Sequence, residues 1–272
     1  MRDATRGDAF ARVDASGEPA TTFVDYLDAV TAIDAARMYK RRSYERLRIV
    51  PGARVLDVGC GVGDDVRAIA ELVGESGRVV GVDLSEQLIA EARRRTRMPS
   101  NIDFTTGDTH DLRFDDETFD ASRVDRTLQH LADPAQAVRE LVRVTRSGGR
   151  VVASEPDWDT IAFDAANVPL TRTIARVMSD DRRNPWMGRR LYPLFVENGL
   201  RELSFEGFVI PVFDFEQADQ LTGIVPAAAI ARERGEITSI DEAAWLADLR
   251  ERSAHGRFFA AVSLYVVAGT KP

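Results

Sequence analysis

Residues 55–65 read VLDVGCGVGDD, an apolar run that passes into three glycines at alternating positions and then into two acids. The apolar, β-branched residues predict a buried strand, and the acids after the glycines are typical of the first turn of a helix. In an open parallel sheet, ligands bind beyond the carboxyl ends of the strands, where such a turn lies. The stretch therefore predicts an α/β fold with a ligand site at this turn.

Strands and helices alternate along the chain after this stretch. We expect further strands, in chain order, at 78–85, 101–108, 119–125, 150–156, 201–211 and 258–269. We expect helices at 64–73, 86–97, 134–145 and 189–198. Alternation of this kind implies right-handed crossovers and a mostly parallel sheet with helices on both faces.

Three segments do not follow this alternation of strands and helices. Residues 1–50 begin as a polar stretch and continue in a helical pattern, so we expect an N-terminal helical arm or lid there. Residues 51–272 are expected to form the core. Within the core, 214–254 is alanine-rich, helical in pattern and too long for a hairpin loop, and we interpret it as a lid insertion. Residues 157–187 lack a clean period, and we assign them to the lid as well.

The composition indicates an acidic protein without cysteine pairing. The chain has 272 residues, and 36 lysines and arginines against 44 acids give a net charge of −8. This balance argues against nucleic acid or an anionic membrane as a partner, since proteins that bind phosphate usually carry a basic surface. Cys60 is the only cysteine and the three histidines are scattered, so neither a disulfide nor a metal site is expected. We see no membrane span or signal peptide and expect a cytoplasmic protein, whereas the oligomeric state cannot be read.

The glycine stretch does not fit a dinucleotide site. The pattern G-x-G-x-x-G needs a glycine at position 64 if it starts at Gly59, and at position 66 if it starts at Gly61. Asp64 and Val66 stand there instead. The two acids that open the helix would also repel a pyrophosphate at its N-terminus. Acids at this place suit a helix cap or a ligand that carries a cationic or amine group.

Five motifs in chain order carry a resemblance to a known family. They are VLDVGCGVG at 55–63, VVGVDLS at 79–85, TTGDTHDL at 105–112, RTLQHLADPAQAVREL at 126–141 and RVTRSGGRVVASEP at 143–156. Together they resemble the motifs of class I S-adenosylmethionine-dependent methyltransferases of the small-molecule, natural-product branch. The resemblance implies a doubly wound, mostly parallel seven-stranded sheet with an antiparallel last strand. It also implies S-adenosyl-L-methionine as cofactor and S-adenosyl-L-homocysteine as product.

The resemblance further implies a cofactor site at the ends of the first three strands. Asp57 would hold the loop or the ammonium group of the cofactor, and Asp83 would accept both ribose hydroxyls, a bidentate contact that suits a carboxylate. Asp108 would accept the adenine amine. The other cofactor residues are the glycine turn, the neighbours of the later acids and a cation for the cofactor's carboxylate: Gly59, Cys60, Gly61, Gly63, Leu84, Thr109 and Arg37, with Lys40 as the alternative cation. The glycines would let the backbone approach the methionine part, where a Cβ would intrude.

The acceptor side of the site is less defined. Methyl transfer needs an aligned acceptor, exclusion of water and, for some acceptors, a base. His130 lies just beyond the fourth strand, where this branch places residues that face the methyl group, and histidine titrates near neutral pH. We predict that His130 is the general base or, alternatively, a cap of the following helix. Glu155 would orient His130 or bind the acceptor, Arg126 would meet an anionic group, and Trp158 and Trp186 would line an apolar pocket.

Three functions are compatible with these residues. The first is methyl transfer to a small organic acceptor, such as a secondary metabolite, on an oxygen, nitrogen or carbon atom. The second is a non-methylating isomerisation or cyclisation by an enzyme of this fold that binds S-adenosylmethionine. The third is a non-catalytic binding module, which would require a lost cofactor site, whereas the motifs here are intact. An enclosing lid favours a small molecule over a protein or nucleic acid, and we predict the first function.

Overall fold

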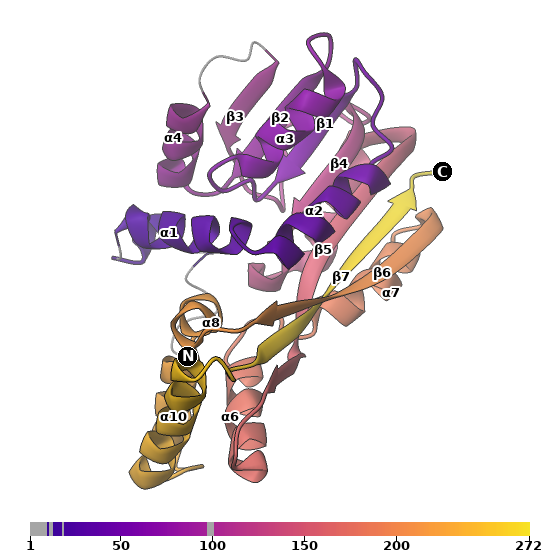
Figure 1. Ribbon diagram of the computed structural model, residues 1–272. Helices are drawn as coiled ribbons and strands as arrows, with labels where there is room; N and C mark the ends of the chain where they lie inside the picture. Colours follow the sequence, from indigo (N-terminus) through magenta and orange to yellow (C-terminus); the bar gives the residue numbers. More distant parts are fainter. Residues whose placement is uncertain (1–9, 11–12, 18, 97–100) are drawn as a thin grey trace.

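The computed structural model describes residue 10 and residues 13–17, 19–96 and 101–272. Residues 1–9, 11, 12 and 18 of the expected N-terminal arm lie outside the described residues. So does Arg97, at the end of an expected helix. Seven strands form one sheet in the order β3-β2-β1-β4-β5-β7-β6 (Figure 1). The strands are β1 (Arg54–Val58), β2 (Arg78–Asp83), β3 (Ile102–Thr106), β4 (Phe119–Asp125), β5 (Thr145–Phe163), β6 (Arg201–Val212) and β7 (Ala260–Thr270).

The strand directions confirm the predicted fold class. Strands β1 to β5 pair in parallel, whereas β7 runs antiparallel to both of its neighbours, β5 and β6. The sheet is therefore doubly wound, mostly parallel and closed by an antiparallel last strand. The chain leaves β1 toward β2 on one side and later returns to β4 on the other side of β1. This reversal between β1 and β4 is the place where ligands bind in folds of this type.

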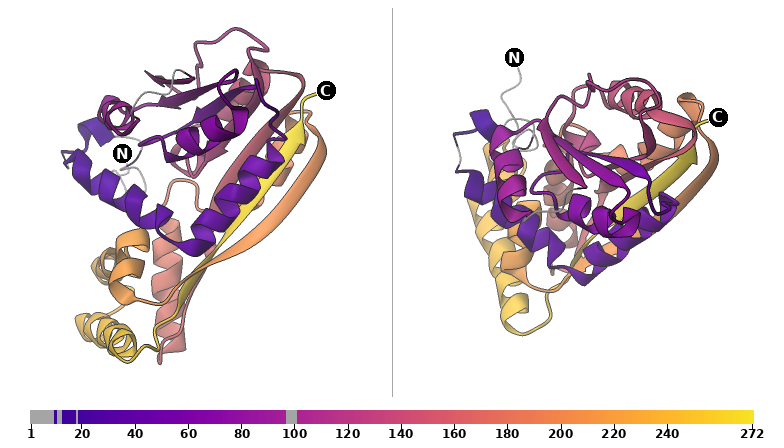
Figure 2. Two further views of the ribbon diagram at one scale, coloured as in Figure 1. Left: turned by 45° about the horizontal axis from the view of Figure 1, so that its top comes forward. Right: turned by 90° about the horizontal axis from the view of Figure 1, so that it is seen from above.

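Helices cover both faces of the sheet, as Figure 2 shows in the view from above. They are α1 (Ala20–Thr31), α2 (Asp34–Arg46), α3 (Asp64–Val73), α4 (Glu86–Arg95), η2 (Leu128–His130), α5 (Pro134–Val144), α6 (Val168–Asp180), α7 (Met187–Glu197), α8 (Phe215–Thr222), α9 (Ile224–Glu233) and α10 (Ser239–Ala254). The two-residue period of a strand sends Val55 into the core beneath α3 and α4, and Leu56 into the core beneath α5 and α7. In the described part of the chain, every helix is too short or too polar to cross a membrane.

Strand β5 is much longer than the sequence predicts. It was expected to end at Pro156 but continues to Phe163, paired with β7 as far as Ala260. The pairing with β4 ends at Ser154, so beyond that residue β5 has no neighbour on that side. Pro156 lies on this free edge, where a missing N–H costs little, and proline there does not end the strand.

The extended ends of β5, β6 and β7 carry a second group of helices, α6, α8 and α10, seen below the sheet in Figure 1. The alanine-rich stretch at 214–254 forms three helices, α8 to α10, and only the middle of 157–187 is helical, as α6. Trp245 of α10 is 2% exposed, and its Nε1 donates a hydrogen bond of 2.9 Å to Thr171 of α6. The apolar side chains of these helices continue the hydrophobic core that lies beneath α3 and α4.

Five charged side chains are buried where β1, β4, α2 and α3 meet, and we call them the buried charge cluster: Lys40, Asp57, Asp65, Arg123 and Asp125. Arg123 lies at the centre and is completely buried. Its guanidinium is 2.9 Å from Asp57, 3.2 Å from Asp65 and 3.1 Å from Asp125. Lys40 of α2 pairs with Asp65 at 2.5 Å and with Asp125 at 2.8 Å. The cluster ties two strands to the two helices that follow α1.

Removing the central cation should lower the free energy of unfolding more than a substitution at the surface does. Arg123→Met leaves three buried carboxylates with one cation, and the loss of a buried partner typically lowers the free energy of unfolding by about 3–5 kcal/mol. Urea denaturation at neutral pH measures this. Arg201→Met, at an exposed position of β6, is the matched control and should change the value by less than about 0.5 kcal/mol. A loss below about 1 kcal/mol in Arg123→Met would show that the cluster does not hold these elements together.

Candidate active site

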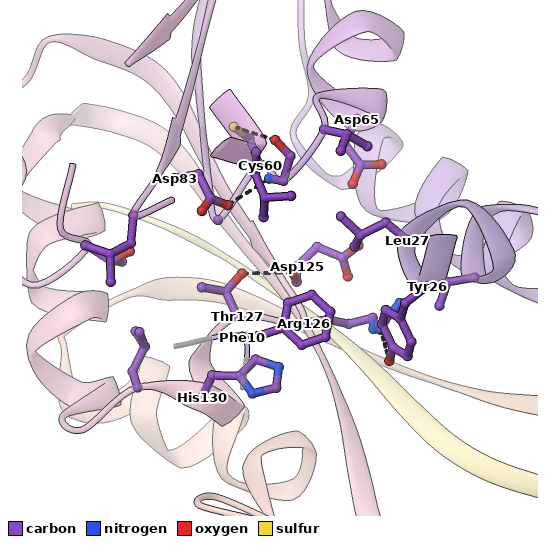
Figure 3. Close-up of a pocket in the computed structure, with 18 of the residues that line it drawn as sticks. Phe10, Tyr26, Leu27, Cys60, Asp65, Asp83, Asp125, Arg126, Thr127 and His130 are labelled. Carbon is purple, nitrogen blue, oxygen red and sulfur yellow. Dashed lines mark hydrogen bonds between the residues drawn. The ribbon is translucent and has the colours of Figure 1, made fainter. Parts of the chain in front are cut away.

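A cavity of about 270 Å³ opens at the reversal point between β1 and β4 (Figure 3). Its wall is built from the turn after β1, the end of β2, the loop after β3, the turn after β4 and helix α1. The sequence-predicted residues that line it are Gly59, Cys60, Gly61, Asp83, Leu84, Asp108, Thr109, Arg126 and His130. Six others do not line it: Arg37, Asp57, Gly63, Glu155, Trp158 and Trp186.

The glycine turn owes its shape to two close approaches. Gly59 has a φ of +69°, and a Cβ there would lie 2.0 Å from the Thr127 hydroxyl. Gly63 has a φ of +79°, and a Cβ there would lie 2.6 Å from the ring of Phe104. Both positions therefore exclude any other residue. Gly59 brings the turn against the β4 side of the cavity, whereas Gly63 packs the start of α3 onto β3, away from the cavity.

Asp83 joins the glycine turn to the end of β2. Its Oδ2 accepts a hydrogen bond from the Gly61 N–H at 2.8 Å, and its Oδ1 accepts one from the Ser85 N–H at 3.0 Å. Burial raises the pKa of this carboxyl above its ordinary value. The carboxylate is fixed by two backbone donors, and each oxygen keeps a lone pair for a ligand in the cavity.

Asp108 and Leu84 complete this side of the wall. Asp108 accepts a hydrogen bond of 2.9 Å from the N–H of His110, whose ring nitrogen is 2.7 Å from the same oxygen. Burial acts to raise the pKa of Asp108, but the contacts with His110 outweigh it and leave the pKa lowered. Leu84 lines the cavity, and its apolar side chain is 54% exposed. An acid and an open apolar side chain thus lie on the same side of the cavity.

The buried charge cluster forms the floor of the cavity on the β4 side. Asp65, Asp125 and Lys40 line it, while Asp57 lies behind them, bonded to Arg123. Burial raises the pKa of Asp57 to about 7. Burial would also raise the pKa of Asp65, but Arg123 and Lys40 outweigh it and lower the pKa.

Asp125 is the member of the cluster with a carboxylate oxygen that no described residue bonds. Its Oδ2 accepts a hydrogen bond of 2.8 Å from Nζ of Lys40. Its buried Oδ1 has no hydrogen-bond partner among the described residues. With Asp57 ionised, the three carboxylates outnumber the two cations by one charge. The sequence analysis missed Asp125, although its place at the end of β4 was a usable signal, since the other acids of the site also end strands. The placement of Arg37 is different: its side chain is 53% exposed and pairs with Asp34.

Glu155 supports the turn that carries His130. Its Oε1 accepts hydrogen bonds from the N–H groups of Thr127 at 2.8 Å and Leu128 at 2.6 Å, just before the short helix η2. Its Oε2 is buried without a partner among the described residues, and burial raises the pKa of this carboxyl to about 8. His130 ends η2 and faces the cavity beside Phe10, whose ring centre is 5.4 Å from the imidazole (Figure 3). Glu155 thus acts on the site through the backbone.

The two predicted tryptophans lie apart from each other. Trp158 is buried, and its Nε1 donates a hydrogen bond of 2.6 Å to Gln129. It lines a second, smaller cavity next to the first. Trp186 is 44% exposed, stacks with Arg189 and Arg190, and lines neither of these two cavities.

The family of the chain follows from a comparison with known proteins. A family model described as "Methyltransferase domain" matches residues 49–199, which include the whole cavity wall except the part from α1, Phe10 and Lys40. The chain belongs to the class I S-adenosylmethionine-dependent methyltransferases. S-adenosylmethionine is accordingly its cofactor.

Individual relatives of this methyltransferase agree with the assignment. An uncharacterized 37.1 kDa protein in transposon Tn4556 of Streptomyces fradiae is 40% identical over 90% of this chain and 70% of its own. A demethylmenaquinone methyltransferase of Staphylococcus carnosus is 33% identical over 52% of this chain. The chain spans 58% of that relative's length. Among solved structures, the 4+2-cyclase SpnF has the same fold, with a TM-score of 0.53, 20% identity and coverage of 86% and 80% of the two chains.

The buried acid Glu155 predicts a pH dependence of stability. The folded protein holds this proton up to about pH 8, whereas an ordinary glutamate loses it near 4.5. Between these values the unfolded chain binds fewer protons, so the free energy of unfolding falls as pH rises, by about 1.4 kcal/mol per pH unit at most. Glu155→Gln keeps the accepting oxygen and removes the proton. Its free energy of unfolding should therefore increase relative to wild type between pH 5.5 and pH 8.

Urea denaturation of the two proteins at several pH values measures this difference. Glu197→Gln, at an exposed position of α7, is the matched control and should keep the wild-type slope. Identical slopes for wild type and Glu155→Gln would mean that Glu155 is ionised in the fold.

Proposed function

We propose that this methyltransferase acts in the cytoplasm on a small organic acceptor, such as a secondary metabolite, with His130 as the general base. The observation that carries the proposal is the make-up of one cavity. Five acids line it, at or near the ends of β2, β3 and β4 and at the start of α3, and His130 faces it from the turn after β4. The demethylmenaquinone methyltransferase relative supports a small organic molecule as acceptor.

The adenosine part of the cofactor fits the side of the cavity formed by β2 and β3. We assign the ribose hydroxyls to Asp83, whose two oxygens are already oriented by backbone donors. Leu84 offers an apolar surface for the adenine, and Asp108 and the backbone of Thr109 offer polar contacts at its edge. Gly61 leaves room for the ligand beside α1, where a Cβ would lie 3.0 Å from Leu27.

The amino-acid part of the cofactor fits the floor formed by the buried charge cluster. We assign its ammonium group to Asp125, because a buried carboxylate oxygen without a partner, in a cluster with one excess negative charge, is suited to a cation. Lys40, which lines the same floor, is the cation for the cofactor's carboxylate. Asp57 then serves as a positioning residue that fixes Arg123, and Arg37 lies outside the site.

When bound, the cofactor supplies a methyl group on a sulfonium, and the carbon–sulfur bond breaks as the bond to the acceptor forms. The chain's own residues align the acceptor and exclude water. The rings of Phe10 and Tyr26 pack at a tilt of 53°, with their centres 5.1 Å apart, and both line the cavity together with His130. A ring nitrogen of His130 takes the proton that the acceptor loses. Glu155 holds the backbone of η2, so that the imidazole keeps its place.

The fold also admits the alternative of a non-methylating isomerisation or cyclisation, since the solved cyclase named above shares it. Cofactor turnover separates the two functions. A methyltransferase must form one S-adenosylhomocysteine for each acceptor converted, whereas the alternative leaves S-adenosylmethionine unchanged. Acceptor-dependent formation of S-adenosylhomocysteine, followed by chromatography over a panel of phenols, carboxylates and amines, is the test. Conversion of a substrate with no loss of the cofactor would overturn methyl transfer.

The base is tested by substitution once an acceptor is identified. His130→Ala should lower turnover by roughly 10²–10⁴-fold, the range of a lost general base, with little change in affinity for S-adenosylhomocysteine. In steady-state kinetics from pH 5 to 9, His130→Ala should also no longer show the fall in rate at acidic pH that protonation of the base causes in the wild type. His255→Ala, at an exposed position after α10, is the matched control and should keep wild-type turnover. Near-normal turnover of His130→Ala would exclude it as the base.

The ribose assignment predicts a loss of cofactor affinity. Asp83→Ala removes a charged acceptor and should weaken S-adenosylhomocysteine binding by about 1–3 kcal/mol, measured by titration calorimetry. Asp103→Ala is the control, because Asp103 lies on β3 outside the cavity wall and pairs with Arg78 at 2.5 Å. Unchanged affinity of Asp83→Ala would remove Asp83 from the site.

A further inference from the structure

A second cavity of about 60 Å³ adjoins the cofactor cavity. It lies between α1, α2 and the ends of β5, β6 and β7, and the sequence did not predict the extension of β5 that borders it. Its wall is apolar, with Ile161, Ile210, Leu221, Ala261 and Leu264 among its members, and no acid among the described residues lines it. Unfilled apolar space forfeits packing contacts, so a cavity of this kind is suited to an apolar ligand.

Arg126 and Tyr26 stand between the two cavities and line both. Nη2 of Arg126 donates a hydrogen bond of 2.5 Å to the Tyr26 hydroxyl, and the guanidinium lies 5.3 Å from the tyrosine ring (Figure 3). The backbone of Arg126 has a φ of +53°, a conformation that is rare outside glycine and is found at functional sites. The unusual backbone is held by a hydrogen bond of 2.8 Å from its N–H to the Ser154 carbonyl.

The guanidinium of Arg126 forms no ion pair with any described residue. The preceding residue, Asp125, is the nearest acid in sequence, and Lys40 and Arg123 already engage it. Burial acts to lower the pKa of this guanidinium, but Tyr26, Tyr39 and Asp125 outweigh it and leave the pKa raised, so the side chain stays charged. No carboxylate of the described residues is within ion-pair distance, and the guanidinium keeps donors for an anion. The arrangement is therefore suited to a ligand that brings the anion.

A second arginine borders the small cavity. The guanidinium of Arg182 lies 3.6 Å from the ring centre of Trp158 and donates a hydrogen bond of 2.8 Å to the Thr222 carbonyl. Trp158 and Thr222 both line the cavity, and Arg182 too forms no ion pair with the described residues. Burial lowers the pKa of Arg182 to about 10. Two cations thus border the small cavity, whereas five acids line the larger one: Asp64, Asp65, Asp83, Asp108 and Asp125.

We infer that the acceptor is an amphipathic carboxylate, with its apolar body in the small cavity and its anionic group on Arg126, in place of the Tyr26 hydroxyl. The methyl goes to a second, protonated group of the same molecule beside His130, which takes that group's proton as the bond to the methyl carbon forms and the carbon–sulfur bond breaks. The inference rests on the proposed function and names the substrate class of the same site. A carboxylate is the anion that a guanidinium binds with two parallel hydrogen bonds. The five acids lie on the larger cavity alone, whereas Arg126 lies at the boundary, so the acids favour the cationic cofactor and Arg126 favours the anionic group of the acceptor. Side-chain rotation of Tyr26 opens the way between them.

Titration calorimetry on the protein saturated with S-adenosylhomocysteine tests the inference with three probes of equal length. These are octanoate, octan-1-ol and octylamine. Octanoate should bind at least about tenfold more tightly than octan-1-ol, and octylamine more weakly than either, because only the carboxylate pairs with Arg126. Equal affinities of the acid and the alcohol, or tighter binding of the amine, would overturn the inference.

Two variants locate the binding. Arg126→Gln should abolish the preference for octanoate over octan-1-ol, while Arg172→Gln, at an exposed position of α6, should retain it. Tyr26→Phe removes the hydroxyl that competes for Arg126 and should tighten octanoate roughly threefold without changing octan-1-ol. A preference that survives in Arg126→Gln, or a Tyr26→Phe protein that binds octanoate no more tightly than wild type, would contradict the site.

Affinity for S-adenosylhomocysteine, measured for each protein before the probes are added, reports on folding and on the proposed function. A wild type that binds no S-adenosylhomocysteine overturns the proposed function and the inference with it. A wild type that binds S-adenosylhomocysteine but does not prefer octanoate overturns the inference alone. Variants that keep wild-type affinity for S-adenosylhomocysteine are folded, and their probe affinities are then directly comparable.

Discussion

The buried guanidinium of Arg123 is the contact on which the rest of the site depends. It holds carboxylates from β1, β4 and α3 within 3.2 Å, and Lys40 from α2 pairs with two of them, Asp65 and Asp125. Five charges taken out of water are stable only when each has a partner. The cluster meets this condition except at Oδ1 of Asp125 and Nη2 of Arg123, which have no hydrogen-bond partner among the described residues. In our proposal the Asp125 oxygen binds the cofactor's ammonium group. The interaction that joins the elements also leaves the excess negative charge in the cavity floor.

The end of β4 is where the two halves of the site meet. Asp125 turns to the cofactor cavity, and Arg126, the next residue, turns to the boundary with the apolar cavity because of its left-handed backbone. The turn continues into η2, which ends at His130, and Glu155 on the neighbouring strand holds its backbone. Six consecutive residues thus present, in our proposals, a carboxylate for the cofactor, a cation for the acceptor and a base.

The sequence predicted the parts of the site that depend on local structure. The glycine turn, Asp83 and Asp108 follow strand ends, and the chain geometry alone brings strand ends to one edge of a parallel sheet. Asp125 is the last residue of β4 and follows this rule, whereas Asp57 lies one residue before the end of β1 and bonds to Arg123 behind the cavity. The motif resemblance alone could not separate these two acids. The extension of β5 was hidden by Pro156, which reads as a strand end unless the free edge is known. That extension forms part of the wall of the apolar cavity, so the sequence did not predict the cavity either.

A crystal structure of the complex with S-adenosylhomocysteine tests the account most directly, because it locates both ends of the ligand at once. The account predicts the ribose hydroxyls on Asp83, the homocysteine amino nitrogen within hydrogen-bond distance of Asp125, and the sulfur facing Arg126 and His130. A ligand whose amino group lies away from Asp125, with the buried charge cluster unchanged, would contradict the role given to the cluster.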